Sequence, residues 1–264
     1  MRVDGSKNVY GAAVGILMLR TRFPRIPGDV GNALTWPFPV LYRTVQEASP
    51  DRVVRRRGEG LEDAFVEAAR ELVALGADGI VSNCGFLSLF QARLAATAGV
   101  PVAASSLMQI PWIERLLPEG RRVGVLTISA ASLTPEHLAA AGARADTPVF
   151  GTDGGSEFTR AILNDEPSLD IEQARNDILE AAAALVARHQ DLGAIVLECT
   201  NMVPFAADIR RAVGLPIFSM YNLVLWFQQG LAPRRFPLDF DDTRANSVSG
   251  PVRASDRATL QERT

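Results

Sequence analysis

A stretch that occurs twice constrains this chain more than any other feature of its 264 residues. Residues 80–84 read Ile-Val-Ser-Asn-Cys and residues 195–199 read Ile-Val-Leu-Glu-Cys, and Cys84 and Cys199 are the only cysteines. Each cysteine is followed by a phenylalanine 6 residues on, a glycine 15 residues on and a proline 17 residues on. The copies are 115 residues apart (199 − 84). A repeated frame of this length predicts a duplicated structural unit.

Each copy is typical of a strand, a cysteine, a helix and a second strand. The apolar runs before the cysteines suit buried parallel strands, and the segments that follow have helical spacing and end on a glycine. Each cysteine should therefore lie at the carboxyl end of a strand, where open α/β sheets bind their ligands. Backbone amides at the start of the next helix favour a thiolate, so we expect a lowered thiol pKa.

Further strand-like and helix-like segments alternate along the chain. Strands are expected at residues 10–19, 38–45, 79–81, 100–104, 121–127, 147–151, 194–197 and 215–218. This alternation predicts an α/β fold, and the repeat predicts two pseudo-symmetric parallel-sheet α/β domains with the active site in the cleft between them. We place the first domain at 1–117 plus 217–264, with the C-terminal helix and tail, and the second at 118–216.

Composition narrows the class of protein. With 47% hydrophobic and 22% charged residues and a net charge of −3, the chain has no feature that favours nucleic acid or an anionic membrane as a partner. The apolar run at 10–19 is too short to span a bilayer and lacks the features of a signal peptide, so we expect a cytoplasmic protein.

Two scarcities argue against a cofactor. Lys7 is the only lysine and precedes the first strand, whereas a pyridoxal enzyme needs a lysine in its pocket. His137 and His189 are the only histidines, both in helix-like stretches, and are expected at the surface. They do not supply the clustered ligands of a zinc site. We therefore predict neither a metal nor an organic cofactor.

Two equivalent thiols on opposite sides of one bound molecule suit proton transfer at carbon. One thiolate takes a proton from one face and the opposite thiol returns a proton to the other face. The alternatives are that both cysteines are small core residues or form a structural disulfide. A different class also stays open, namely a small-molecule sensor with inert or redox-responsive cysteines.

The motifs around these cysteines resemble those of the aspartate/glutamate racemase superfamily. The resemblance rests on Asn83-Cys84-Gly85, on the strand 123–127 ending in Thr127, and on Cys199-Thr200-Asn201 with Pro204. It implies a site between two α/β domains, no cofactor, and Cys84 and Cys199 as the catalytic acid/base pair. It also implies that Asn83, Gly85, Thr127, Thr200 and Asn201 bind the substrate.

The chain departs from glutamate racemases in two motifs. It has Leu19-Arg20-Thr21 where they carry an Asp-Ser pair, and Asn201 where they carry a histidine, so glutamate is not the expected substrate. We predict a cofactor-independent racemase or epimerase acting on another small carboxylate, such as an amino acid or a hydantoin, and expect a homo-oligomer. A maleate-type isomerase or a decarboxylase of the same superfamily is the alternative.

Three further segments have less specific interpretations. The loop 20–32 is rich in proline, glycine and arginine, and its arginines (Arg20, Arg22 and Arg25) are candidates for contact with a substrate carboxylate. The basic run 51–57 is expected to face solvent. From Pro233 onward the chain has little hydrophobic periodicity, which favours an extended tail.

Overall fold

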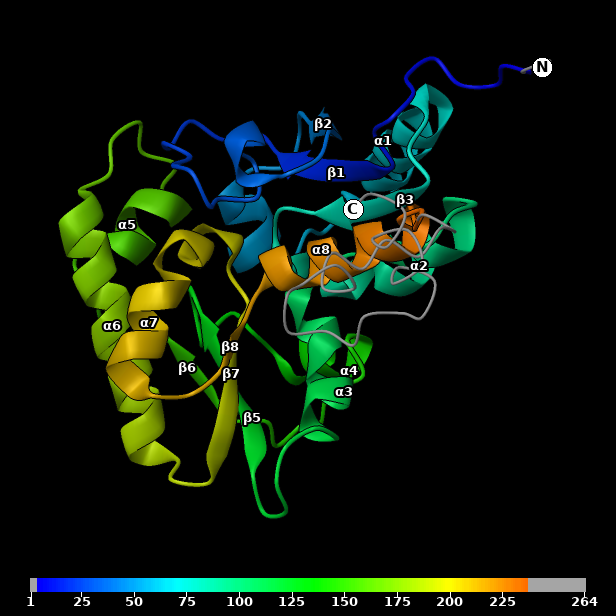
Figure 1. The fold of residues 1–264 in the computed structure, drawn as a ribbon. Helices are drawn as coiled ribbons and strands as arrows, with labels where there is room; N and C mark the ends of the chain where they lie inside the picture. The colour runs from blue at the N-terminus through cyan, green and yellow to red at the C-terminus, as the bar shows by residue number, and fades with distance from the viewer. Residues whose placement is uncertain (1–3, 237–264) are drawn as a thin grey trace, which may run out of the picture. The chain divides into compact units, whose positions relative to one another are not determined.

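The computed structural model describes residues 4–236, and it contains two parallel four-stranded sheets flanked by helices (Figure 1). The strands of the first sheet are β1 (Val14–Leu19), β2 (Val40–Val45), β3 (Gly79–Ser82) and β4 (Val102–Ala103). Those of the second sheet are β5 (Arg122–Thr127), β6 (Val149–Gly151), β7 (Leu192–Leu197) and β8 (Ile217–Phe218). All eight are expected strands. The predicted tail falls largely on 237–264, outside the described residues.

The two sheets have the same topology. Their strand orders are β2-β1-β3-β4 and β6-β5-β7-β8, so the third strand of each half lies between the first and the fourth. Each cysteine follows that third strand, β3 in one sheet and β7 in the other. The α/β prediction is confirmed, and the repeated frame corresponds to equivalent elements. Both sheets belong to one compact unit that ends at Ala232, and the predicted domain boundaries stay a prediction.

Helices cover the sheets and connect their strands. They are α1 (Glu62–Leu75), α2 (Gln91–Thr97), α3 (Ile110–Glu114), α4 (Pro135–Ala140), α5 (Phe158–Leu163), α6 (Ile171–Arg188), α7 (Ala206–Val213) and α8 (Met220–Leu231). Short helical turns are η1 (Ala33–Thr35), η2 (Asp51–Arg55), η3 (Gly85–Phe90), η4 (Ser106–Gln109) and η5 (Thr200–Phe205). Residue choice explains several ends: the Asp170 carboxylate accepts from the Gln173 amide at the start of α6, and Gly214 adopts a left-handed conformation after α7.

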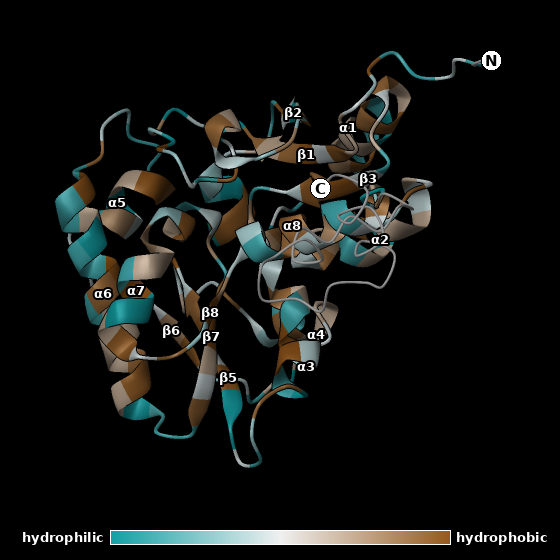
Figure 2. Ribbon diagram, in the orientation of Figure 1, coloured by the Kyte–Doolittle hydropathy of each residue, from teal (hydrophilic) through white to brown (hydrophobic). Residues whose placement is uncertain are grey.

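The strands form the centre of the hydrophobic core. All six residues of β1 are buried. In Figure 2 the strands are mostly brown, apart from the teal start of β5, whereas α6 and α7 carry both brown and teal residues. One core cluster joins side chains of both sheets, including Leu17 and Val196. A second cluster packs Leu223 and Val224 of α8 against Ile16 of β1. The last described helix therefore returns to the first sheet.

Two surface predictions are wrong. His137 is fully buried in α4, because its imidazole completes a capping box with Thr134 and packs edge-on against Phe86, with ring centroids 5.1 Å apart. The basic run 51–57 is only partly solvated, since Val53 and Val54 of η2 are buried. In both cases a side chain within a polar stretch of the sequence faces the core.

Candidate active site

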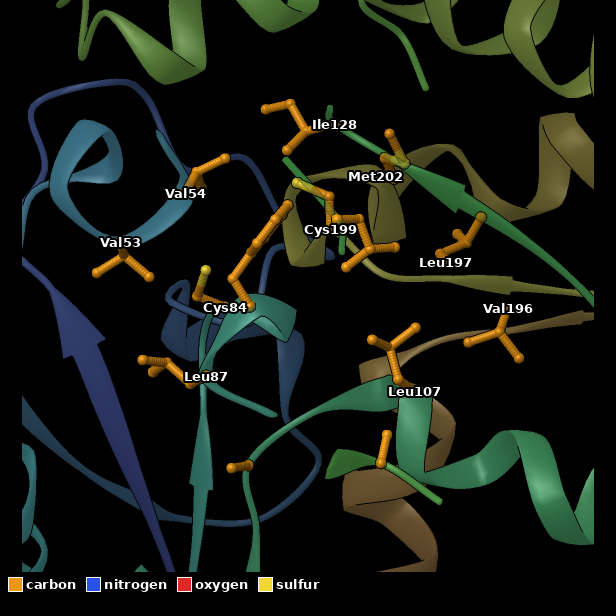
Figure 3. Close-up of a cluster of buried hydrophobic side chains, with 14 of the residues drawn as sticks. Val53, Val54, Cys84, Leu87, Leu107, Ile128, Val196, Leu197, Cys199 and Met202 are labelled. Carbon is orange, nitrogen blue, oxygen red and sulfur yellow. The ribbon is translucent and has the colours of Figure 1, made fainter. Parts of the chain in front are cut away.

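Cys84 and Cys199 face one small cavity between the two sheets. Their sulfurs point into the same space, which Val54 and Ile128 border (Figure 3). Both cysteines are buried and free, so the disulfide alternative does not hold in this structure. Each directly precedes a short helical turn, η3 after Cys84 and η5 after Cys199. The geometry therefore brings the two predicted thiols together.

About 350 Å³ of space lies between the atoms that line this cavity. The lining combines polar and apolar side chains from both halves: Leu19, Phe23, Arg25, Pro50, Val54, Asn83, Cys84, Phe86, Ile128, Ile162, Leu163, Glu198, Cys199, Thr200 and Asn201. Asn83, Thr200 and Asn201 thus lie where the sequence places a substrate. Gly85 and Thr127 do not line the cavity, because both contact the side chain of Glu198 instead.

Asn83 offers a free hydrogen-bond donor at the cavity wall. Its Oδ1 accepts from the amide of Leu19 at 3.0 Å, whereas its buried Nδ2 has no partner. Its main-chain carbonyl accepts from the Thr200 hydroxyl at 2.6 Å, which joins the two cysteine segments. A buried amide nitrogen without a partner costs stability unless a ligand satisfies it. Asn83 is therefore suited to bind an acceptor such as a carboxylate.

Cys199 belongs to a buried polar chain that begins in the loop 20–32. The thiol donates to Asn201 Oδ1 at 3.5 Å, and Asn201 Nδ2 donates to the carboxylate of Asp29. Asp29 in turn accepts from Arg25 at 2.8 Å. Arg25 also donates to Thr21 at 3.0 Å and stacks over the ring of Phe23. This arrangement fixes the orientation of Asn201 and brings one cation to the cavity.

Of the other loop arginines, Arg22 contacts the second half of the molecule. Its amide and guanidinium both donate to Asp165, and the guanidinium bond to the Asp165 carbonyl is 2.9 Å long. Arg20 is exposed. Among the three loop arginines, only Arg25 lines the cavity, so it is the one placed to meet a bound anion.

Glu198 is a candidate functional residue that the sequence analysis does not predict. Its side chain is 1% exposed and lines the cavity between the two cysteine segments. Oε2 accepts from the Thr127 hydroxyl at 2.7 Å, and backbone amides of Ile128, Phe86 and Gly85 also stabilise the charged form. Burial outweighs these contacts and raises the pKa of the carboxyl to about 7.

The expected lowering of the thiol pKa values is wrong for this structure. Backbone amides of Phe86 and Leu87 do lower the pKa of Cys84, and the amide of Asn201 lowers that of Cys199. Burial raises both pKa values well above the ordinary range, and the neighbouring Glu198 raises them further. Desolvation therefore outweighs the amides at the start of each helical turn and favours the neutral form of each thiol.

Two features are absent from residues 4–236, the part of the chain that the structure describes. Within this range no group of three or more histidine, cysteine, aspartate or glutamate side chains is arranged to hold a metal ion. No helix in the same range has both the length and the apolar character needed to cross a membrane.

The fold and the cavity define an α/β protein with two parallel sheets and a cysteine from each half at one cavity. Residues 108–226 match the family model described as Asp/Glu/Hydantoin racemase. The structure resembles a mutant of arylmalonate decarboxylase with associated sulfate, with a TM-score of 0.56 and 14% identity over 86% of this chain and 97% of that chain. The resemblance to the aspartate/glutamate racemase superfamily is thus confirmed.

A second solved structure shows the same fold. Aspartate racemase of Picrophilus torridus superimposes with a TM-score of 0.52 and 13% identity, covering 86% of this chain and 96% of that chain. At this level of identity the likeness concerns the fold alone. The match to the Asp/Glu/Hydantoin racemase family model supports racemase-type or decarboxylase-type chemistry without selecting between them.

Curated relatives match most of the chain. A dimethylsulfoniopropionate lyase of Durusdinium sp. clade D is 28% identical over 243 residues, which cover 88% of this chain and 79% of that protein. Dimethylsulfoniopropionate lyase 5 of Emiliania huxleyi is 29% identical over 227 residues, which cover 80% of this chain but 44% of that protein. The match therefore spans less than half of the Emiliania protein.

Proposed function

We propose that this chain is a lyase that removes the proton α to a carboxylate between Cys84 and Cys199 and expels a β-leaving group. Dimethylsulfoniopropionate, the compound in the names of the relatives, is the substrate we propose. One observation favours elimination over racemisation: the two thiols have unlike surroundings.

Those surroundings differ in charge and in hydrogen bonding. Burial and the charge of Glu198 raise the pKa of both thiols. The Cys199 thiol donates to Asn201, and Cys84 and Asp29 raise its pKa further. The Cys84 sulfur faces the amides of Phe86 and Leu87, and Arg25 lowers its pKa. A racemase must treat mirror-image substrates alike, which favours matched acids and bases. An elimination from an achiral α-carbon needs one base only.

The reaction balances without a cofactor. A thiolate takes one proton from the α-carbon, and the electron pair of that C–H bond forms the double bond between the α- and β-carbons. The bond from the β-carbon to sulfur breaks, and its electron pair leaves with sulfur as neutral dimethyl sulfide. The other product is acrylate, and the thiol returns its proton to solvent. Donors at the carboxylate stabilise the enolate-like intermediate.

The cavity contains groups suited to both ends of this zwitterion. Asn83 Nδ2 is an unpartnered donor for the carboxylate, and Arg25 supplies positive charge beside it. Phe86 lines the same cavity, and aromatic faces attract sulfonium-type cations as they attract other cations. The positive sulfonium would also favour a thiolate, which offsets part of the desolvation that keeps both thiols neutral.

Racemisation or epimerisation of a small carboxylate is the second candidate, and the duplicated frame around the cysteines favours it. A substrate panel separates the two reactions. Purified protein is incubated in D2O with dimethylsulfoniopropionate, amino acids and hydantoins, and each mixture is followed by proton NMR. Lyase activity gives acrylate and dimethyl sulfide from the first compound. Deuterium exchange or racemisation of a chiral compound, without any alkene product, would overturn the proposal in favour of the racemase.

A further inference from the structure

We propose that Glu198 is an internal carboxylate that occupies a set of anion-binding groups in the site and thereby restricts the substrate to one carboxylate. This inference rests on the proposed function and names the substrate class of the same cavity. Glu198 would then be a specificity-determining residue that excludes dicarboxylates.

The contacts of Glu198 are those expected of a bound carboxylate ligand. Oε2 accepts from the Thr127 hydroxyl at 2.7 Å, and the amides of Gly85, Phe86 and Ile128 stabilise the charge. A Cβ atom on Gly85 would lie 2.5 Å from Oε1 and 2.6 Å from the carbonyl oxygen of Glu198. Glycine is therefore required at residue 85 for the carboxylate to approach the backbone this closely.

The duplicated frame supplies an internal comparison. Asn83 and Glu198 are equivalent, since each directly precedes its cysteine. Asn83 Oδ1 accepts from the last residue of β1, Leu19, and Glu198 Oε2 accepts from the last residue of β5, Thr127. The amide at residue 83 leaves Nδ2 free, whereas the carboxylate at residue 198 leaves no donor. One half can thus receive an anionic group, and the other half already contains one.

This asymmetry determines which ligands fit. A substrate with one carboxylate can bind at Asn83 and Arg25. Above pH 7, where Glu198 is ionised, a second carboxylate on its side of the cavity would find the hydrogen-bond donors occupied and would be repelled by a like charge in a buried site. A cationic group is favoured there for the same reason. The cavity is therefore suited to a zwitterion with a single carboxylate.

The test uses formate as a substitute for the missing side-chain carboxylate. Glu198→Ala should vacate the donors at Gly85, Phe86 and Thr127, whereas Glu198→Gln is the matched control that keeps the space filled. Melting temperatures of wild type and both variants are measured with increasing sodium formate against sodium chloride at equal ionic strength. We expect formate to stabilise Glu198→Ala alone, saturably and by at least about 3 °C, as a ligand of the native state does.

A second binding measurement uses the wild type. Titration calorimetry should show that propionate binds at least about tenfold more tightly than succinate, and Glu198→Ala should narrow this ratio. An equal response of Glu198→Ala and Glu198→Gln to formate, or equal binding of both acids by the wild type, would overturn the inference. If Glu198→Ala does not fold, Glu198→Ser takes its place, and failure of both variants to fold even in formate also counts against it.

These readouts do not depend on turnover. If the protein lacks lyase activity but Glu198→Ala binds formate, the proposed function fails while the internal carboxylate stands. If the protein is an active lyase but binds succinate as well as propionate, the function stands while the inference fails.

Discussion

Replacing Glu198 by glutamine should change how stability depends on pH. The pKa of Glu198 in the folded protein is about 7 against an ordinary value of 4.5, a difference of 2.5. Each pKa unit corresponds to 1.36 kcal/mol, so burying the ionised form costs about 3 kcal/mol. Between pH 4.5 and 7 the folded state retains a proton that the unfolded chain releases. The contribution of Glu198 to the free energy of unfolding is therefore full below pH 4.5, falls as pH rises, and reaches its minimum above pH 7.

His137 contributes with the opposite sign. Burial lowers its pKa from 6.5 to about 4, so between these values the unfolded chain binds a proton that the folded state does not. Stability from this group is present above pH 6.5 and is lost as pH falls toward 4, again by about 3 kcal/mol. The two contributions offset each other between pH 4.5 and 6.5. Together, these two groups should therefore leave the unfolding free energy of the wild type nearly constant between pH 4.5 and 6.5.

Urea unfolding of the wild type and Glu198→Gln at half-unit steps from pH 4.5 to 8 measures this pH dependence of the unfolding free energy. The difference in unfolding free energy, variant minus wild type, should increase by about 3 kcal/mol across pH 4.5–7 and then level off. Glutamine at the exposed Glu67 is the matched control and should give a curve parallel to that of the wild type. A difference between Glu198→Gln and the wild type that stays constant with pH would refute a buried carboxyl with a raised pKa.

Three further predictions concern the same region. Gly85→Ala should lower the free energy of unfolding by about 1–3 kcal/mol, because its Cβ would meet Glu198. Gly230→Ala in α8 is the control, since a Cβ there would meet nothing within 4 Å. It should raise the free energy of unfolding by up to about 1 kcal/mol in the same denaturation assay. One of the two variants Cys84→Ser and Cys199→Ser should lose most lyase activity, and the rates of α-proton exchange by NMR should differ between them by at least about tenfold. Equal rates would favour a symmetric two-base racemase. Asn83→Ala should raise KM more than it lowers kcat in steady-state assays, and the opposite pattern would exclude a role in binding the carboxylate.

Much of the fold follows from local patterns in the sequence. The buried strands are short apolar runs, and the glycine after each cysteine unit ends a helix. The repeated frame then indicates which two strands occupy equivalent places in the sheets. By contrast, α5 was not expected. It is only six residues long, and its start depends on Asp177, which accepts from the amides of Glu157 and Phe158 across a distance of about 20 residues in sequence.

The site was only partly predictable for a related reason. Cys84, Cys199, Asn83, Thr200 and Asn201 belong to short motifs at strand ends, so their meeting at one cavity follows from the topology. The interaction of Thr127 and Gly85 with Glu198, however, is a contact between segments that only the tertiary structure brings together. An acidic residue between a buried strand and a cysteine was the available signal, because such a position is seldom solvated.

The sign of the thiol pKa shifts depends on burial, which the motifs do not reveal. The helical turns after Cys84 and Cys199 do present amides to the sulfurs, as expected. Their effect is smaller than that of the surrounding apolar atoms and of Glu198. Thiols that burial keeps neutral are consistent with activation by a cationic substrate.

The central claim is that a thiolate of the Cys84–Cys199 pair removes the α-proton of a β-sulfonium carboxylate. The most direct measurement is the initial rate of dimethyl sulfide release from dimethylsulfoniopropionate, compared between the wild type and the double variant Cys84→Ser/Cys199→Ser, with circular dichroism to verify that both are folded. The account predicts release of dimethyl sulfide with an equal amount of acrylate by the wild type, and none above the uncatalysed rate by the double variant. Equal release by the two proteins, or a wild type that releases none, would contradict it.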